Sequence, residues 1–132
     1  MSVIPLSSEP LDLFFEEVPE FSKEFKDLKK KYSSLDDDLE LFKKALRGGP
    51  DRVGGVVLIS SLGAGVQTDE KRFYKARKFR CRSLGQYALR VIFCWLTARR
   101  KIFFIEIYSK SEKANNDSAR IKKYSSQFDE VH

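Results

Sequence analysis

The chain has 132 residues, 42% of them apolar and 33% charged, which is typical of a globular protein and excludes an intrinsically disordered one. Its 25 Lys and Arg outnumber its 19 Asp and Glu and give a net charge of +6. The only histidine is the last residue, His132, so histidine-based catalytic triads and the usual zinc hydrolase sites are excluded.

The cellular compartment can also be predicted. No apolar run approaches the ~20 residues that span a bilayer, and the N-terminus lacks the basic and apolar regions of a secretory signal. Cys81 and Cys94 stand alone in strand-like segments, so we expect buried, reduced thiols and neither a metal nor another cofactor. These features predict a cytoplasmic protein without a membrane partner.

The first predicted elements form the N-terminal part of one domain. The length predicts a single domain over residues 11–132, after a flexible tail over residues 1–10, and residues 11–18 could give a short edge strand. Apolar residues then recur at helical spacing over residues 21–32 and again over residues 35–46. This pattern predicts an αα-hairpin.

The second half of the chain reads mainly as strands. Residues 48–70 are rich in glycine, and we expect a loop over the core with room for one short strand. Strand patterns follow over residues 73–84, 87–97 and 102–108 and predict a β-meander. Residues 115–127 are predicted to form a polar terminal helix, which makes the predicted fold class α+β.

The strands contain a cationic segment that has no acidic residue. Outside this segment the chain has 14 basic against 19 acidic residues, so the segment accounts for the positive net charge. A cationic stripe on a β-sheet is typical of binding to RNA or DNA, although many charge runs are only solvated surface. Between Lys71 and Ile105 the cations are Lys71, Arg72, Lys75, Arg77, Lys78, Arg80, Arg82, Arg90, Arg99, Arg100 and Lys101.

Strand alternation divides the first of these cations between two faces. Because residues two apart share a face, Lys78, Arg80 and Arg82 are expected to project together. Arg77 is expected to project the other way, with the apolar Phe79, and is interpreted as a steering or solvated charge. The first three cations are therefore the candidate functional group.

Arg90 interrupts an otherwise apolar central strand. A guanidinium in that position is costly unless a partner satisfies it, and that partner could be Glu106 or the phosphate of a substrate. Tyr108 and Lys110 are expected on one face of the last strand, where Tyr108 could contact substrate or belong to the rim. Tyr87 could stack on a base.

The order of these segments resembles the RelE/HigB-like toxins of type II toxin–antitoxin modules, which belong to the RelE/ParE superfamily. The resemblance covers residues 12–127 in element order, and its motifs lie in the second half. They follow two predicted helices and are K-x-R-K-F-R-C-R-S-L-G from Lys75 to Gly85, L-R-V-I-F from Leu89 to Phe93, and I-E-I-Y-S-K from Ile105 to Lys110.

The resemblance implies a fold, partners and an activity. The family packs its helical hairpin on one face of a twisted antiparallel β-sheet, and its RelE and HigB members cut mRNA in the ribosome. A co-encoded antitoxin silences them. ParE-like relatives share the fold but poison DNA gyrase, and a chain that keeps only the fold could be a non-enzymatic RNA-binding module. All three functions stay open at this point.

The resemblance also suggests residue roles. Lys78 and Arg80 match the family's basic pair, Arg82 a further basic position, and Arg90 the arginine of its R-V-I-Y motif. Phe93 replaces the tyrosine of that motif, and the family's late tyrosine has no secure counterpart.

Metal-free RNA cleavage uses the 2′-hydroxyl as nucleophile and needs a base, cations around the phosphate and an acid. Lys78, among neighbouring cations, is the candidate base or acid, and the three arginines are candidates to hold the phosphate. The predicted catalytic set is thus Lys78, Arg80, Arg82 and Arg90. The predicted substrate contacts are Lys75, Lys110, Tyr108 and Tyr87.

Overall fold

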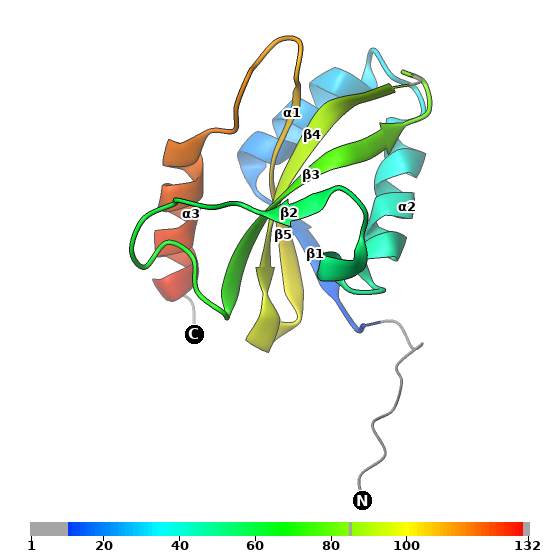
Figure 1. Cartoon of the computed structure of the whole chain (residues 1–132). Helices are drawn as coiled ribbons and strands as arrows, with labels where there is room; N and C mark the ends of the chain where they lie inside the picture. The colour runs from blue at the N-terminus through cyan, green and yellow to red at the C-terminus, as the bar shows by residue number, and fades with distance from the viewer. Residues whose placement is uncertain (1–10, 85, 131–132) are drawn as a thin grey trace, which may run out of the picture.

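The computed structural model describes residues 11–84 and 86–130 (Figure 1). The predicted tail over residues 1–10 and His132 lie outside these ranges. None of the described helices is long and apolar enough to cross a membrane. In chain order the elements are β1 (Phe14–Glu17), α1 (Pro19–Lys29), α2 (Leu35–Leu46), the 3-10 turn η1 (Pro50–Arg52), β2 (Val56–Leu58), β3 (Lys71–Cys81), β4 (Gln86–Leu96), the 3-10 turn η2 (Thr97–Arg99), β5 (Lys101–Ser109) and α3 (Ser118–Glu130).

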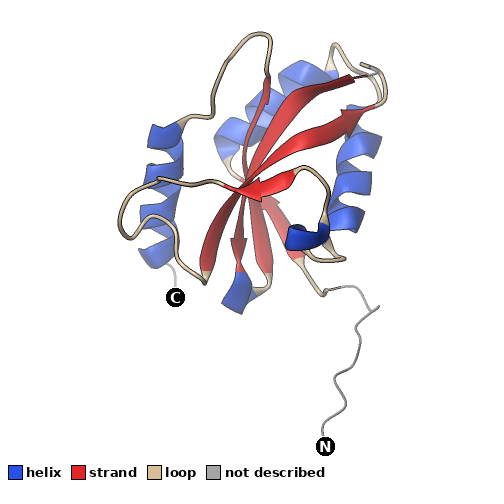
Figure 2. Ribbon diagram, viewed as in Figure 1, coloured by secondary structure: helices blue, strands red, loops and turns tan. Residues whose placement is uncertain are grey.

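The strands form a five-stranded sheet in the order β1-β5-β4-β3-β2 (Figure 2). β2, β3, β4 and β5 pair antiparallel with their neighbours, as the predicted meander requires. β1 instead runs parallel to β5, so the prediction of a purely antiparallel sheet is wrong at this edge. A parallel pair needs a long crossover, and the chain between β1 and β5, which includes α1 and α2, provides one.

α1 and α2, the two predicted N-terminal helices, pack on one face of the sheet (Figure 1). The ring of Phe21 in α1 lies 5.3 Å from that of Phe104 in β5. In α2 the ring of Phe42 lies 5.4 Å from that of Phe79 in β3 and 5.9 Å from that of Phe93 in β4. Burial of these aromatic rings is the main apolar contribution to this layer of the core.

α3 packs on the opposite face of the sheet, away from α2 in Figure 1. Phe103 neighbours Phe104 and therefore points to this opposite face, where its ring lies 4.7 Å from that of Phe128. Lys71 is buried at the start of β3, and its ammonium lies 2.7 Å from the carboxylate of Asp129. α3 begins and ends three residues later than the predicted helix, and it buries Ile121, Tyr124, Ser125 and Phe128 although the sequence predicted a polar helix.

A β-bulge in β3 decides which face each of its cations uses. Ala76 pairs with Val91 of β4 and Phe79 pairs with Leu89, so three steps on β3 match two on β4. Ala76 and Phe79 are both buried, whereas the two residues between them are exposed. The extra residue therefore reverses the alternation of the strand from this point on.

Candidate functional site

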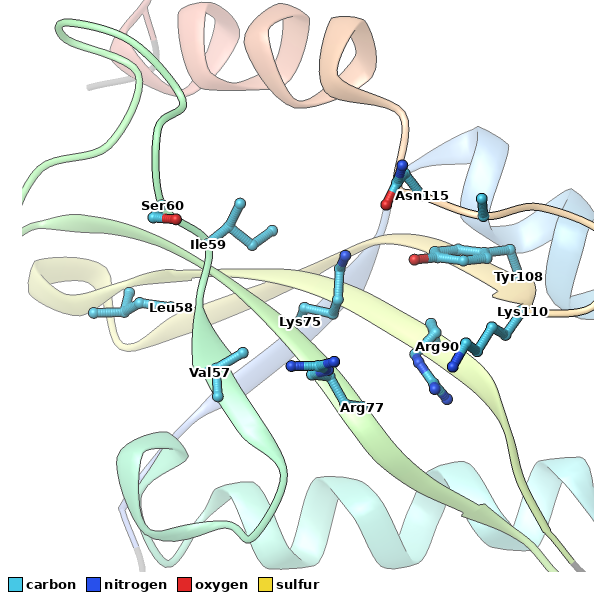
Figure 3. Close-up of a pocket in the computed structure, with 11 residues that line it drawn as sticks. Val57, Leu58, Ile59, Ser60, Lys75, Arg77, Arg90, Tyr108, Lys110 and Asn115 are labelled. Carbon is cyan, nitrogen blue, oxygen red and sulfur yellow. The ribbon is translucent and has the colours of Figure 1, made fainter.

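Three strands present cations to one hollow on the sheet, which we call the sheet-face pocket. It has a volume of about 330 Å³. Figure 3 shows the side chains of β3, β4 and β5 on one side of the hollow and those of the β2 region on the other. Its lining consists of Lys75, Arg77, Arg90, Tyr108 and Lys110, with Val57, Leu58, Ile59, Ser60, Ala114 and Asn115 around them.

The strand register explains why these side chains meet. Arg90 of β4 lies directly opposite Tyr108 of β5, and cross-strand partners share a face of the sheet. Lys75 and Arg77 are two residues apart on β3, before the bulge takes effect, so both point to this face. Lys110 follows the end of β5 and completes the set.

The carboxylates of the described residues do not neutralise these cations. Among the described residues no carboxylate forms an ion pair with Lys75, Arg77, Arg90 or Lys110. Arg90 donates hydrogen bonds only to backbone carbonyls, at 2.7 Å to Tyr87 and 3.3 Å to Leu89. A pocket of this kind suits an anionic ligand, because its positive charges otherwise repel one another.

Glu106 does not pair with Arg90, although the sequence left that pairing open. Glu106 is almost fully buried in β5, where its carboxylate pairs with the ammonium of Lys113 and accepts a hydrogen bond of 2.8 Å from the backbone N–H of Asp117. Its charge is therefore committed to the loop before α3. The two partners considered for Arg90 were Glu106 and a phosphate. Because Glu106 contacts Lys113 and Asp117 instead, a phosphate is the favoured partner.

Lys75 has the electrostatic environment of a candidate base. Burial lowers the pKa of its ammonium below the ordinary lysine value of 10.5, and the neighbouring charges of Arg77 and Arg90 lower the pKa further. The charge of Glu106 acts in the opposite direction but does not cancel these effects. The neutral amine, which can accept a proton, is thus more accessible at Lys75 than in a solvated lysine.

Tyr108 contributes a phenol hydroxyl to the pocket. Burial raises the pKa of its phenol, and the nearby charge of Glu106 raises the pKa further, so the hydroxyl keeps its proton at neutral pH. The ammonium of Lys113 lies 5.5 Å from the centroid of its ring. In Figure 3 the hydroxyl points into the hollow, toward the side on which Lys75 lies.

Lys78, Arg80 and Arg82 lie elsewhere, around a second hollow of about 400 Å³ between β3 and α2 that we call the edge pocket. The prediction that these three residues project together agrees with this arrangement, but they line a different hollow from Arg90. They lie on the part of β3 that follows its last pairing with β2, at Ala76, where the strand runs beside α2. The edge pocket is also lined by Asp38, Leu41, Phe42, Ala45 and Val53.

The residue that the sequence interpretation missed is Arg77. It was read as a steering charge that projects with Phe79, yet it lines the sheet-face pocket while Phe79 packs against Phe42. Two adjacent polar residues between the apolar Ala76 and Phe79 break the alternation, and that break is the signal for a bulge. Tyr87, a predicted substrate contact, is 52% exposed and lines neither pocket.

The thiols and carboxylates of the described residues do not form a cluster that could hold a metal ion. Both cysteines are buried and unpaired. Burial raises the pKa of the Cys94 thiol, which keeps it protonated and unreactive. The chemistry available to the described residues is therefore that of amines, guanidinium groups, carboxylates and phenols.

Comparisons with known proteins identify the fold. No protein-family model matches the sequence, and no curated protein matches it either. Among solved structures, a chain from the crystal structure of the archaeal RelE–RelB complex of Pyrococcus horikoshii OT3 superposes with a TM-score of 0.53. The match covers 76% of this chain and 97% of that chain, at 14% sequence identity. The protein has a RelE-like fold, and at this identity the likeness concerns the fold alone.

Proposed function

We propose that this protein is a toxin of a type II toxin–antitoxin module that cuts ribosome-bound mRNA without a metal ion. The observation that carries the proposal is the sheet-face pocket: three cations without a carboxylate partner among the described residues surround a lysine of lowered pKa, on a RelE-like fold. By analogy with the RelE–RelB complex, an antitoxin is the expected partner. Action on ribosomes would place the protein in the cytoplasm.

The pocket supplies each group that the reaction needs. Arg77, Arg90 and Lys110 are proposed to hold the scissile phosphate and to stabilise the additional negative charge of the phosphorane. The neutral amine of Lys75 takes the proton of the 2′-hydroxyl, and the 2′-oxygen then attacks phosphorus. The P–O5′ bond breaks as Tyr108 donates its proton to the leaving oxygen.

This sequence of steps balances without a further reactant. The products are a 2′,3′-cyclic phosphate on one RNA fragment and a 5′-hydroxyl on the other. Lys75 is left protonated and Tyr108 deprotonated, and exchange of one proton through water restores both groups. Tyr108 is thereby proposed to act as the general acid. The sequence alone offered no secure counterpart of the family's late tyrosine.

The proposal changes the sequence-based assignment of the base. Lys78, Arg80 and Arg82 remain candidates from the sequence, but they line the edge pocket, whereas Lys75 shares the sheet-face pocket with Arg90. A base must lie within hydrogen-bond reach of the proton that it removes, which favours a lysine in the same pocket as the phosphate ligands. Arg90 keeps its proposed role in both assignments.

Two other functions compete with this proposal. A ParE-like poison of DNA gyrase would not need a lysine of lowered pKa among phosphate ligands, so the environment of Lys75 favours the nuclease. A non-enzymatic RNA-binding module would need the cations but not the base and the acid. Both alternatives predict that mRNA stays intact.

The deciding experiment adds the protein to a translating ribosome extract and maps mRNA ends by primer extension. We expect cuts in phase with the codons, with 5′-hydroxyl and 2′,3′-cyclic phosphate ends, and we expect Arg90→Ala to slow their appearance about 10²-fold. Intact mRNA together with gyrase-linked DNA breaks would replace the proposal by the ParE-like function. Intact mRNA without DNA damage would leave RNA binding alone.

A further inference from the structure

Glu106 is a buried carboxylate to which the proposed reaction gives no role. It is 1% exposed and lies in β5, two residues before Tyr108. Burial of a charged group is costly unless ion pairs and hydrogen bonds satisfy it. The position of this charge beside the sheet-face pocket therefore needs a physical explanation.

A β-bulge in β5 turns Glu106 toward the face of the sheet that holds the proposed catalytic groups. Ile92 of β4 pairs with Glu106, and the next residue of β4 pairs with Phe104, so one step on β4 matches two on β5. Phe104 packs against α1, and without the bulge Glu106 would share its face. Because Lys75 pairs with Ile92 in turn, Lys75, Ile92 and Glu106 form one row across three strands. Tyr108 lies two residues further along β5 and points to the same face.

The carboxylate of Glu106 holds the segment between β5 and α3 at two points. It pairs with the ammonium of Lys113 and accepts a hydrogen bond of 2.8 Å from the backbone N–H of Asp117. The carboxylate of Asp117 in turn accepts a hydrogen bond of 3.0 Å from the backbone N–H of Arg120, in the first turn of α3. Residues 114–115, between the two points, line the sheet-face pocket. Glu106 therefore fixes part of the wall of that pocket.

Lys113 connects Glu106 with the ring of Tyr108. Its ammonium pairs with Glu106 and also lies 5.5 Å from the centroid of the Tyr108 ring, where a cation is attracted to the ring. Lys113 lines a separate hollow beside α1, which Tyr108 also borders, so this contact leaves the sheet-face pocket free for a substrate. In Figure 3 the Tyr108 hydroxyl points into the sheet-face pocket.

We propose that Glu106 is a positioning residue of the sheet-face pocket, which acts on Tyr108 through Lys113. This inference rests on the proposed function, because it assigns Glu106 to the step in which Tyr108 protonates the leaving 5′-oxygen. Glu106 does not touch the substrate. It holds Lys113 against the Tyr108 ring, so that the hydroxyl is already directed at the reacting atoms when RNA binds.

An effect through position and an effect through charge have opposite signs. Burial raises the pKa of the Tyr108 phenol, and the charge of Glu106 raises it further. The same charge opposes the lowering of the Lys75 pKa. Loss of the charge alone would therefore make Tyr108 a stronger acid and Lys75 more often neutral, and cleavage would not become slower. Slower cleavage after this loss is the sign of lost positioning.

The test measures the cleavage rate constant of Glu106→Gln in the ribosome extract at saturating protein. We expect it to fall at least about tenfold, because displacement of a reacting group by about 1 Å costs up to 10²-fold. In a Tyr108→Phe background, which lacks the hydroxyl, the same change should alter the rate less than about twofold. A merely structural role of Glu106 would slow both backgrounds equally.

Variants of the segment between β5 and α3 complete the test. Lys113→Met breaks the same contact and should slow cleavage as much as Glu106→Gln. Because the Lys113 side chain is 40% exposed, this variant decides the question if Glu106→Gln does not fold. Lys113→Arg keeps the cation and should stay within about threefold of wild type.

Glu112→Gln is the matched control, because the Glu112 carboxylate lies on the same segment but is 66% exposed and pairs with Lys31 instead. Its cleavage rate should stay within about twofold of wild type, since an exposed ion pair contributes little. Urea denaturation shows whether each variant is folded. Equal slowing by Glu106→Gln in both backgrounds, or a rate of Glu106→Gln at or above that of wild type, would overturn the proposal.

A second readout does not require cleavage. The nuclear magnetic resonance signals of the Tyr108 ring, assigned by their loss in Tyr108→Phe, should move in Glu106→Gln and Lys113→Met but not in Glu112→Gln. If the wild type cuts no mRNA, these signals decide: movement retains the coupling of Glu106 to Tyr108 while the nuclease proposal fails, and unchanged signals remove both. Cleavage by the wild type with unchanged signals and rate in Glu106→Gln retains the nuclease and removes the positioning role.

Discussion

The sheet-face pocket and the edge pocket lie on either side of the bulge in β3, and both are rich in cations. They differ in what surrounds those cations. In the sheet-face pocket, Arg77 and Arg90 have no carboxylate partner among the described residues and stand beside a tyrosine hydroxyl. In the edge pocket, a buried carboxylate, Asp38, holds Arg82, and apolar side chains of α2 form a wall. The two pockets therefore differ in the neighbours of their cations rather than in the presence of cations.

The cations of the whole cationic segment from Lys71 to Ile105 can be divided in the same way, by whether a carboxylate lies beside them. Within the part of the chain that the structure describes, five of its cations pair with carboxylates from other segments and so stabilise the fold. Those pairs are Lys71 with Asp129, Arg72 with Asp51, Arg82 with Asp38, Arg100 with Asp12, and Lys101 with Glu16. The pairs of Arg72, Arg100 and Lys101 are largely exposed and stabilise a fold only slightly, so their main effect is to neutralise the segment away from the two pockets. The remaining positive charge is concentrated around the bulge.

The largest expected effect comes from Lys75. If Lys75 is the base, Lys75→Ala should slow mRNA cleavage about 10³-fold, within the range for loss of general base catalysis. The rate constant is measured in the ribosome extract at saturating protein. Binding of a non-cleavable RNA with a 2′-deoxy substitution at the scissile position serves as control and should weaken much less. Cleavage within tenfold of wild type would remove Lys75 from the mechanism.

The pH dependence tests the same residue in a second way. Only the neutral amine accepts a proton, so cleavage should accelerate as pH rises toward the pKa of Lys75, which burial and its arginine neighbours lower below 10.5. Lys75→Arg keeps the charge, but arginine does not deprotonate in this range, so the rising limb should vanish. A rising limb that persists in Lys75→Arg would assign the base to another group.

The next largest effect is expected for Arg90. Arg90→Ala removes a phosphate ligand and should slow cleavage about 10²-fold, as loss of one transition-state donor does in other enzymes. Arg90→Lys keeps the charge but not the geometry of the guanidinium and should recover part of the rate. Growth inhibition of cells that express each variant gives a second readout. Full toxicity of Arg90→Ala would contradict both the proposed site and the assignment based on sequence.

Much of the fold could be predicted because it depends on local patterns. The apolar stripe that includes Phe21 and Phe25 predicted α1, and a similar stripe predicted α2. The parallel pairing of β1 with β5 could not be predicted in this way. It depends on the contact of two segments more than 80 residues apart, as in the pairing of Phe14 with Lys101, and no local pattern encodes it.

The candidate site was predicted in part, for an equally physical reason. Arg90, Lys75, Tyr108 and Lys110 were identified as functional candidates, and the structure brings them into one pocket. Arg77 was missed because one inserted residue reverses strand alternation, and simple alternation assumes no insertion. Which cations are neutralised could not be read from the sequence either, because partners such as Asp129 are 58 residues from Lys71.

A smaller effect, on stability rather than on catalysis, is expected at Asp38. Burial disfavours the charge of this carboxylate, but hydrogen bonds from Ser34 and Arg82 outweigh burial and hold its pKa below 3.8. Asp38→Ala removes these bonds, at 2.6 and 2.9 Å, and should lower the free energy of unfolding by about 2 kcal/mol. Urea denaturation measures the loss, with the exposed Asp37→Ala as control.

The sign of the pH effect follows from the lowered pKa of Asp38. The stabilisation is present above the unfolded-state pKa and is lost as pH falls through the lower folded-state pKa. The difference in unfolding free energy between wild type and Asp38→Ala should therefore be constant near neutral pH and shrink below about pH 4. A difference that grows on acidification would mean that the folded state raises the pKa of Asp38 rather than lowering it.

The smallest expected effect gives the sharpest test of which of the two pockets holds the reaction. Arg80 is a catalytic candidate from the sequence, yet it lines the edge pocket and not the pocket that contains Arg90. If the chemistry takes place in the sheet-face pocket, Arg80→Ala should keep its cleavage rate within about threefold of wild type, less than 1 kcal/mol in the barrier. Arg77→Ala is the matched control, because it removes the arginine on the other side of the bulge and should slow cleavage about 10²-fold. Equal rates for the two variants, or a reversed order, would place the reaction in the edge pocket.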